Sequence, residues 1–443
     1  MTILSEKKSK ELLTKVLSFS KADECECNLD GQVGGNIRYA RNTVSTAGEE
    51  SDVTLAVQST FGTRTGVATI NEFDDASLEK VVRRSEELAK LAPENKEHMP
   101  IFGKQKYLES KTYFDSTAKV TAEDRASAAN DSIQPSKKNK LVAAGFLEEA
   151  VRFSAIMNSK GLFAYNTSTN VDFSVTIRTE DGRGSGWASR NYSDYKLLDT
   201  AEASEVAIAK SKGSVGAKEL EPGKYTVILE PAASVGLLGN MMRAFDQRSA
   251  DEGRSFLSNK GAKEDEPKNK LGQKMFDERV TIYSDPQHPI APAAPFGGDG
   301  YPRGRVDWIK GGKIANMPNS PFWAKKTGVD YQPRGGNIIM EGGNESLEGM
   351  IKNTRRGVLV TRLWYIRPLD PQTLLYTGLT RDGTFYIENG KIKYPIKNFR
   401  FNESPIVMLN NIEAMGKPER INGNMIPPMK IRDFTFSSLS DAV

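Results

Sequence analysis

Histidine and cysteine, the residues that most often build metal centres and nucleophilic sites, are scarce in this sequence. Its 443 residues include two histidines and two cysteines. His98 lies in the segment KEHMP and His288 in DPQHP, so both are expected in proline-flanked loops that are far apart in the sequence. A catalytic zinc needs about three protein ligands and an open position for water. A zinc site would have to combine both loop histidines with carboxylates, and loop positions favour solvated side chains instead.

The two cysteines are close together in the segment ECECNLD, which has the pattern of a strand. Side chains two residues apart on a strand point to the same face, so Cys25 and Cys27 are expected to join Leu29 in a core. A disulfide between them would be strained, because the Cα separation of such neighbours is near the upper limit for a bridge. We therefore predict two buried free thiols, which fits a reducing compartment.

Other catalytic patterns are absent or have a simpler explanation. No G-x-S-x-G elbow, which would present a serine nucleophile, precedes a predicted helix. The glycine-rich segment 296–300 (FGGDG) continues as the loop YPRGR, whereas a phosphate site needs a helix N-terminus after its glycines. The adjacent carboxylates at 74–75 and 148–149 would face opposite sides of a strand, which indicates solvated surface.

The charge of the chain gives no reason to expect a nucleic-acid partner. Its 61 basic and 57 acidic residues leave a net charge of +4, and no long basic run or basic helix face is present. The first residues, MTILSEKKSKELLTK, carry charges where a signal peptide would be apolar. No stretch approaches the ~20 apolar residues of a membrane span. We therefore expect a cytoplasmic protein with no membrane and no direct nucleic-acid contact.

The segment most suggestive of a site is 225–244, YTVILEPAASVGLLGNMMRA. Its first five residues are typical of a short buried strand. Pro231 suits the first turn of a helix, where a missing N–H costs nothing. Val235, Leu238 and Met242 follow at helical spacing and predict an apolar helix face.

A strand that runs PGKYTVIL into such a helix resembles the C-terminal domain of the TldD/PmbA family (the TldD/TldE proteases, also called modulators of DNA gyrase). In the TldD branch of that family the helix carries His-Glu-x-x-x-His. Laid on this sequence, those positions are Gly239, Asn240 and Ala244, so both histidines and the glutamate are missing. The TldD branch also takes a cysteine ligand from a loop near the C-terminus, and segment 416–429 (GKPERINGNMIPPM) contains no cysteine. The chain is more similar to the metal-free PmbA (TldE) branch.

Further motifs occur in the order that the family has. NSKG at 158–161 matches its N-S-x-G turn, and ENGKI at 388–392 matches its E-N-G-e-i hairpin. The segment from Gly335-Gly336-Asn337 to Gly342-Gly343 resembles its s-N-l-x-l-x-p-G turn. Asp299-Gly300 stands where the family has D-x-E-G, without the glutamate. The segment 364–371 departs from the pattern.

The resemblance implies a division of labour between two subunits. This chain would be the non-catalytic TldE-like subunit of a heteromeric protease complex, with no catalytic residue, metal or cofactor of its own. Zinc would be in a TldD-like partner, which cuts unfolded or extended peptides. The candidates for this chain's part of the substrate groove are Asp299, Gly300, Trp308 and Asn337. A divergent, homo-oligomeric metallopeptidase with its own non-standard metal site remains an alternative. Modulation of DNA gyrase is interpreted as an indirect effect.

The resemblance also implies a shape for the helix. On a regular helix, residues i and i+5 lie about 140° apart, so ligands at 239 and 244 cannot converge on one ion. We therefore expect a kink or a widened turn near residues 239–244, helped by Gly236 and Gly239.

The patterns along the chain predict an α+β protein with three domains. The first domain, 1–105, is expected to have a helix at 5–19, a meander of four strands (24–29, 37–46, 52–59, 65–70) and a helix at 76–91. The second, 106–215, combines helices near 121–130 and 200–212 with an antiparallel sheet of strands 141–146, 150–157, 163–167 and 171–179. The third, 220–443, is strand-rich, with hairpin turns at 311–312, 382–383, 389–390 and 422–423, and has the TldD/PmbA type of C-terminal fold with a degenerate metallopeptidase site.

Overall fold

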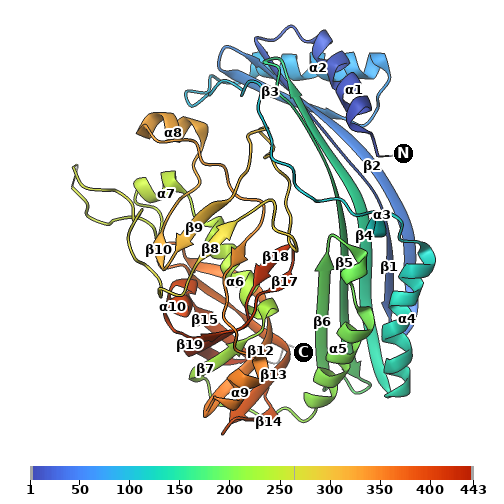
Figure 1. The fold of residues 1–443 in the computed structure, drawn as a ribbon, viewed down its shortest axis with the longest axis vertical. Helices are drawn as coiled ribbons and strands as arrows, with labels where there is room; N and C mark the ends of the chain where they lie inside the picture. Colours follow the sequence, from blue (N-terminus) through green and yellow to red (C-terminus); the bar gives the residue numbers. More distant parts are fainter. Residues whose placement is uncertain (1–2, 264, 441–443) are drawn as a thin grey trace.

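The computed structural model describes residues 3–263 and 265–440, and it has the expected α+β architecture. The first half of the chain builds one long, curved antiparallel sheet with the strand order β3-β2-β1-β4-β5-β6 (Figure 1). Its strands are β1 (Glu24–Ala40), β2 (Thr43–Phe61), β3 (Arg64–Ile70), β4 (Leu141–Asn158), β5 (Phe163–Thr179) and β6 (Ser185–Tyr192).

The strands are longer and fewer than the sequence patterns predicted. The meander has three strands instead of four, β4 and β5 each join two predicted strands, and β6 was missed. Two glycines explain why four strands were predicted in the meander where the structure has three. A Cβ on Gly34 would lie 2.2 Å from the carbonyl oxygen of Glu149, and one on Gly35 would lie 2.1 Å from the Arg125 guanidinium. These glycines allow close packing within a continuous strand, where the sequence suggested a break.

Four helices cover the sheet in two pairs. At one end, α1 (Glu6–Phe19) and α2 (Asp75–Leu91) cover a core that includes Cys25, Cys27 and Leu29. Both cysteines are buried and free, as predicted. At the other end, α4 (Ala122–Lys138) and α5 (Thr200–Gly213) cover a second core. A capping box of Thr121 and Asp124 starts α4, which begins near the expected residue and runs beyond the expected end near residue 130. Two short helical segments, α3 (Asp115–Ala118) and η1 (Tyr195–Leu197), complete this half.

The first two expected domains contribute to the same sheet. β1, from the first, pairs with β4, from the second, over the whole register from Glu26↔Asn158 to Tyr39↔Gly145. The domain limits themselves stay a prediction, but the hydrogen-bonded sheet continues across residue 105.

The second half of the chain contains two smaller sheets around the largest core. The order β12-β7-β19-β15-β13-β14, with an additional pairing of β12 and β13, closes one sheet into a ring, and the other has the order β10-β9-β8-β11-β18-β17. The strands of the ring and its neighbour β16 are β7 (Gly223–Leu229), β12 (Arg356–Asp370), β13 (Leu375–Glu388), β14 (Lys391–Pro395), β15 (Asn398–Glu403), β16 (Ile412–Met415) and β19 (Met429–Ser440). The second sheet has β8 (Ile282–Ser284), β9 (Val306–Lys310), β10 (Lys313–Ile314), β11 (Ile339–Met340), β17 (Glu419–Ile421) and β18 (Asn424–Ile426). The helices are α6 (Pro231–Arg243), α7 (Gln247–Asp251), α8 (Pro321–Thr327), α9 (Leu347–Lys352) and α10 (Pro405–Asn410).

Three of the four predicted hairpin turns are present, at 311–312, 389–390 and 422–423. Each has positive φ at both residues, as the turns of tight hairpins require. The fourth prediction was wrong, because Asp382 and Gly383 lie inside β13. Their φ values of 54° and 121° mark an irregular position within the strand rather than a reversal of the chain. Within the described residues, no helix is both long and apolar enough to cross a membrane.

Candidate functional site

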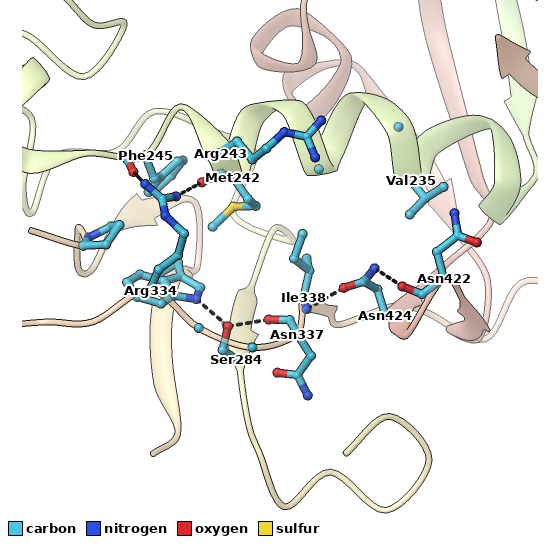
Figure 2. A pocket seen from close by; sticks show the side chains of 16 residues that line it. Val235, Met242, Arg243, Phe245, Ser284, Arg334, Asn337, Ile338, Asn422 and Asn424 are labelled. Carbon is cyan, nitrogen blue, oxygen red and sulfur yellow. Dashed lines mark hydrogen bonds between the residues drawn. The ribbon is translucent and has the colours of Figure 1, made fainter. Parts of the chain in front are cut away.

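A cavity of about 430 Å³ lies beside α6, at the positions where the sequence analysis located the degenerate metal site. Val235, Gly236, Gly239 and Arg243 form its helical wall. The segment 334–338 lies opposite, Asn422 comes from the turn between β17 and β18, and Asn424 is the first residue of β18 (Figure 2). The strand–helix unit β7–α6 positions this wall, because the other face of α6 is buried in the core.

Helix α6 has no widened turn. It is α-helical from Pro231 to Arg243, and the N–H of Ala244 donates to the carbonyl of Asn240 at 3.2 Å, as in a regular last turn. The expectation of a distortion near residues 239–244 was therefore wrong. The helix instead ends there, and Arg334 donates to the carbonyls of Met242 (2.8 Å) and Phe245 (2.9 Å), on either side of the helix end.

The three degenerate positions do not form a metal site in this arrangement. Gly239 faces the cavity, and a Cβ placed there would meet one atom within 4 Å, Nη1 of Arg243 at 3.9 Å. Asn240 accepts a hydrogen bond from Arg243 through its amide oxygen, and Ala244 packs against the core. Zinc prefers imidazole, thiolate or carboxylate ligands, and these residues offer none. Across residues 3–263 and 265–440, no group of three His, Cys, Asp or Glu side chains is placed to hold a metal ion.

The two histidines belong to separate networks. Nε2 of His98 lies 3.6 Å from Oε2 of Glu24, at the start of β1. Nδ1 of His288 accepts hydrogen bonds from the backbone N–H groups of Ile290 (3.2 Å) and Ala291 (3.1 Å), and burial lowers the pKa of His288. The contacts of the two histidines therefore lie in different parts of the described structure.

Trp308 and Asn337, two of the four groove candidates, line the cavity, but their polar groups are already used. Nε1 of Trp308 donates to Oγ of Ser284 at 2.8 Å, and Ser284 donates to the backbone carbonyl of Asn337. The Asn337 amide donates to the carbonyls of Asp285 (2.7 Å) and Ala291 (2.6 Å). Figure 2 shows the hydrogen bond between Ser284 and Asn337 in this network. These side chains hold the cavity floor in shape rather than offering free donors to a ligand.

Asp299 and Gly300, the other two candidates, lie at the junction between the long sheet and the second half. Oδ2 of Asp299 accepts a hydrogen bond from the Tyr331 hydroxyl at 2.6 Å. The carbonyl of Gly300 accepts one from the Tyr107 hydroxyl at 2.7 Å, and Gly300 has φ +71°. Its Cα packs so closely on Leu162 that a Cβ would lie 2.8 Å from that side chain. The structure therefore does not bring the four candidates together in one cavity.

Comparison with known proteins supports the arrangement of motifs. Models of the three domains of the PmbA/TldA metallopeptidases match successive parts of the chain: domain 1 at residues 31–89, the central domain at 110–216 and the C-terminal domain at 222–438. The chain belongs to the TldD/PmbA family. It is a metallopeptidase-related protein by membership of that family, and the cavity beside α6 lies within the matched C-terminal domain.

The sequence relatives are distant. The chain is 26% identical to the metalloprotease PmbA of Escherichia coli O157:H7 over 227 residues, which cover 48% of this chain and 47% of that protein. It is 20% identical to a metalloprotease of Methanothermobacter thermautotrophicus over 292 residues, covering 60% of this chain and 61% of the relative. The chain thus spans about half to three fifths of the length of the curated relatives it matches.

Solved structures share the fold over nearly the full length. TldE from Thermococcus kodakarensis superimposes with a TM-score of 0.85 at 18% identity, over 97% of this chain and 99% of that one. A protein from Bacteroides thetaiotaomicron assigned as a modulator of DNA gyrase gives 0.85 at 21% identity, with the same coverage. One from Thermotoga maritima with a similar assignment gives 0.84 at 18% identity, over 97% of this chain and all of that one.

Segment 416–429, where the family resemblance suggested a place for a cysteine ligand, is hydrogen-bonded to strand β6 of the long sheet. Nε of Arg420 donates to the carbonyl of Asn191 at 2.8 Å, and Nη2 donates to Oδ1 of Asn191 at 3.2 Å. The N–H of Gly423 donates to the same Oδ1 at 2.9 Å. Oδ1 of Asn424 accepts from the N–H of Ile338 at 2.8 Å, which ties the turn to the opposite cavity wall.

Four residues that line the cavity were not predicted from the sequence: Arg243, Arg334, Asn422 and Asn424. Asn422 had a usable signal, because Asn-Gly predicts a tight turn in a segment that the family uses near its metal. Arg334 had a weaker one, because it immediately precedes the Gly335-Gly336-Asn337 motif. Nothing in the sequence showed that these segments face α6.

A buried carboxyl group beside Asp299 predicts a pH-dependent stability. Burial raises the pKa of Glu26 to about 7, and the charges of Asp299 and Glu24 act in the same direction, while hydrogen bonds from Asn158 and Asn28 oppose the shift. The folded state binds the proton of the Glu26 carboxyl group more tightly than the unfolded state does. The free energy of unfolding should therefore fall as pH rises from about 4.5 to about 7. We expect Glu26→Gln to increase the free energy of unfolding at pH 8 by about 2 kcal/mol and to change it little at pH 4.

Urea unfolding followed by circular dichroism at both pH values measures this effect. The substitution Glu87→Gln, at a side chain that is 63% exposed, reports the effect of losing a surface carboxylate. A Glu26→Gln variant that is no more stable than the original chain at pH 8 would contradict the prediction.

Proposed function

We propose that this chain is the non-catalytic, TldE-like subunit of a heteromeric protease that degrades or processes unfolded peptides. The observation that supports this most directly is the cavity beside α6, which remains although Gly239, Asn240 and Ala244 carry no metal ligand. A zinc-bearing, TldD-like partner would supply the metal-activated water that attacks the peptide bond. This chain would supply part of the chamber wall and contacts to the peptide. The cytoplasm is its expected location.

Backbone donors in the cavity wall support a role in peptide binding. Gly335 and Gly336 line the cavity, and within the described residues their N–H groups make no hydrogen bond. Extended peptides are commonly held through their own backbone groups by such unpaired donors, as when a strand is added to a sheet edge. Recognition of the backbone accepts many sequences, which suits a protease of unfolded peptides.

A mixing experiment tests the proposal. We expect the isolated chain to leave an unfolded fluorogenic peptide uncut, and a mixture with the TldD-like chain from the same source to cut it at least about a hundredfold faster, because only the mixture contains a metal-activated water. Cleavage by the mixture should stop on addition of a chelator. Size-exclusion chromatography with light scattering should show a complex that contains both chains.

The alternative, a homo-oligomeric metallopeptidase with its own site, makes the opposite forecast. In that case the isolated chain would contain about one zinc per chain by elemental analysis and would cut peptides in a chelator-sensitive manner. Loss of that zinc on substitution of His98 or His288 would identify the ligands. Either finding would refute the proposed division of labour, and so would failure of the two chains to associate.

A further inference from the structure

The cavity beside α6 carries positive charge without a matching acid. Arg243 and Arg334 line it, and no Asp or Glu is among its lining residues within the described chain. Neither arginine has an ion-pair partner in the described residues. Asp246 is the acidic group whose charge acts on Arg334, but its carboxylate caps α7 through the N–H of Ser249 at 2.8 Å. The cavity beside α6, which would bind a cation in a metallopeptidase, therefore favours an anion in this chain.

The two arginines differ in what they can offer a ligand. Arg334 is exposed, but its Nη1 and Nη2 bond the carbonyls of Met242 and Phe245 at the end of α6. Its charge is therefore fixed at the cavity wall. Arg243 is exposed and bonds only the Asn240 amide oxygen through Nη2, so its Nε and Nη1 remain available. Figure 2 shows the Arg243 guanidinium extending along α6 at the top of the cavity.

Neutral donors surround this charge. The N–H groups of Gly335 and Gly336 are unpaired within the described residues and belong to the wall opposite α6. Asn422, whose backbone has φ +49°, contributes a further side-chain amide at the rim. A guanidinium and backbone N–H groups together are the donor set with which proteins bind carboxylates. The volume of about 430 Å³ is within the range of small-ligand pockets, ~300–1,000 Å³.

We propose that this cavity is a carboxylate-binding subsite, which holds either the C-terminal carboxylate or an acidic side chain of an extended peptide. The peptide as ligand rests on the function proposed above, whereas the preference for an acid rests on the charge of the cavity alone. In this arrangement Arg243 binds the carboxylate, Gly335 and Gly336 donate to it or to the adjacent peptide group, and Arg334 supplies a fixed positive potential. The subsite would anchor one end of a substrate so that the rest of the peptide extends out of this subunit.

Binding of three matched peptides to the full chain tests the proposal. The probes are an N-terminally fluorescein-labelled alanine pentapeptide as the free acid, the same peptide as its C-terminal amide, and the amide with one central glutamate. We expect fluorescence anisotropy at 50 mM salt to give about tenfold tighter binding for the free acid than for the amide, and a smaller ratio at 300 mM salt, where the charges are screened. The glutamate peptide distinguishes the two sources: if it binds as tightly as the free acid, a side chain suffices.

Two substitutions at Gly239 provide a matched pair, because the space in front of this residue is open. Gly239→Glu places a competing carboxylate in the cavity and should abolish the preference for acids. Gly239→Gln has nearly the same size without the charge and should retain that preference. Arg243→Gln should also reduce the affinity for the free acid to that for the amide. Arg254→Gln removes an exposed arginine that pairs with Glu252 outside the cavity and should change nothing.

The proposal is overturned if both acidic peptides bind no tighter than the neutral amide, if no peptide binds, or if Gly239→Glu and Gly239→Gln have equal effects. Those outcomes leave the proposed function separately testable, because cleavage by the mixture of two subunits can occur without any preference for an acid. Conversely, an acid preference in a chain that does not associate with a zinc-bearing partner would support the subsite and refute the subunit role.

Discussion

Replacing Asp382 with alanine is expected to lower the free energy of unfolding by about 3–5 kcal/mol, the usual cost of removing one partner from a buried ion pair. The Asp382 side chain is fully buried. Its Oδ2 accepts from Nε of Arg362 at 2.7 Å, and its Oδ1 accepts from the Ser185 hydroxyl at 2.6 Å. The Arg362 guanidinium lies 4.4 Å from the ring centroid of Trp187 on β6. The substitution would therefore leave the Arg362 guanidinium, whose side chain is 20% exposed, without its carboxylate partner between the long sheet and the second half of the chain.

Chemical denaturation of purified variants measures the effect, and three substitutions serve as controls. Asp382→Asn keeps a side chain that tolerates the φ of 54° and loses only the charge, so it should cost less than alanine. Asp382→Ala combined with Arg362→Leu removes the close pair, keeps Arg381, whose Nε lies 3.7 Å from Oδ2 of Asp382, and should recover part of the loss. Glu87→Ala breaks an exposed pair with Arg84 and should cost less than about 1 kcal/mol. An Asp382→Ala variant as stable as the original chain would show that this ion pair does not hold the two halves together.

Restoring the family's ligand residues is expected not to restore zinc binding. The triple substitution Gly239→His, Asn240→Glu and Ala244→His should bind zinc with a Kd weaker than about 100 μM, or about 5.5 kcal/mol. A structural zinc site is worth about 10 kcal/mol or more. The regular α6 places positions 239 and 244 about 140° apart, and Ala244 packs toward the core while Gly239 faces the cavity. The third ligand expected from segment 416–429 is also absent.

A variant with the histidines on one face of the same helix is the matched comparison. Gly239→His with Arg243→His places two imidazoles four residues apart, a spacing that converges on one ion in helical zinc motifs, and both positions line the cavity. Isothermal titration calorimetry should give tighter zinc binding for this double variant than for the triple variant. Tighter binding by the triple variant would show that α6 can still adopt a distorted turn and that a third ligand is within reach.

Some features of this protein follow from short stretches of sequence. The β7–α6 unit, a helix start near residue 121 and the shared face of Cys25 and Cys27 were predicted, because strand and helix periods and side-chain alternation are local properties. The absence of metal ligands at Gly239, Asn240 and Ala244 could also be predicted, because it follows from the residue types at these positions alone.

Tertiary structure decided the remaining features. Gly34 and Gly35 suggested a break between two strands. They lie instead within one strand, because Glu149 and Arg125 pack directly against them. Asp382 indicated a turn, but it lies inside β13 because Arg362 and Ser185 satisfy its carboxylate there.

The cavity itself is the clearest case. Its wall on α6 was predictable as a helix, whereas the contacts at the end of that helix come from Arg334, a residue of a distant segment that binds the carbonyls of Met242 and Phe245. The two positive charges of the cavity, Arg243 and Arg334, come together only when segment 334–338 folds against α6. Local sequence determines which helix, strand or turn each segment can form. The chemistry of the site depends on which side chains come into contact in the folded protein, and no local pattern predicts those contacts.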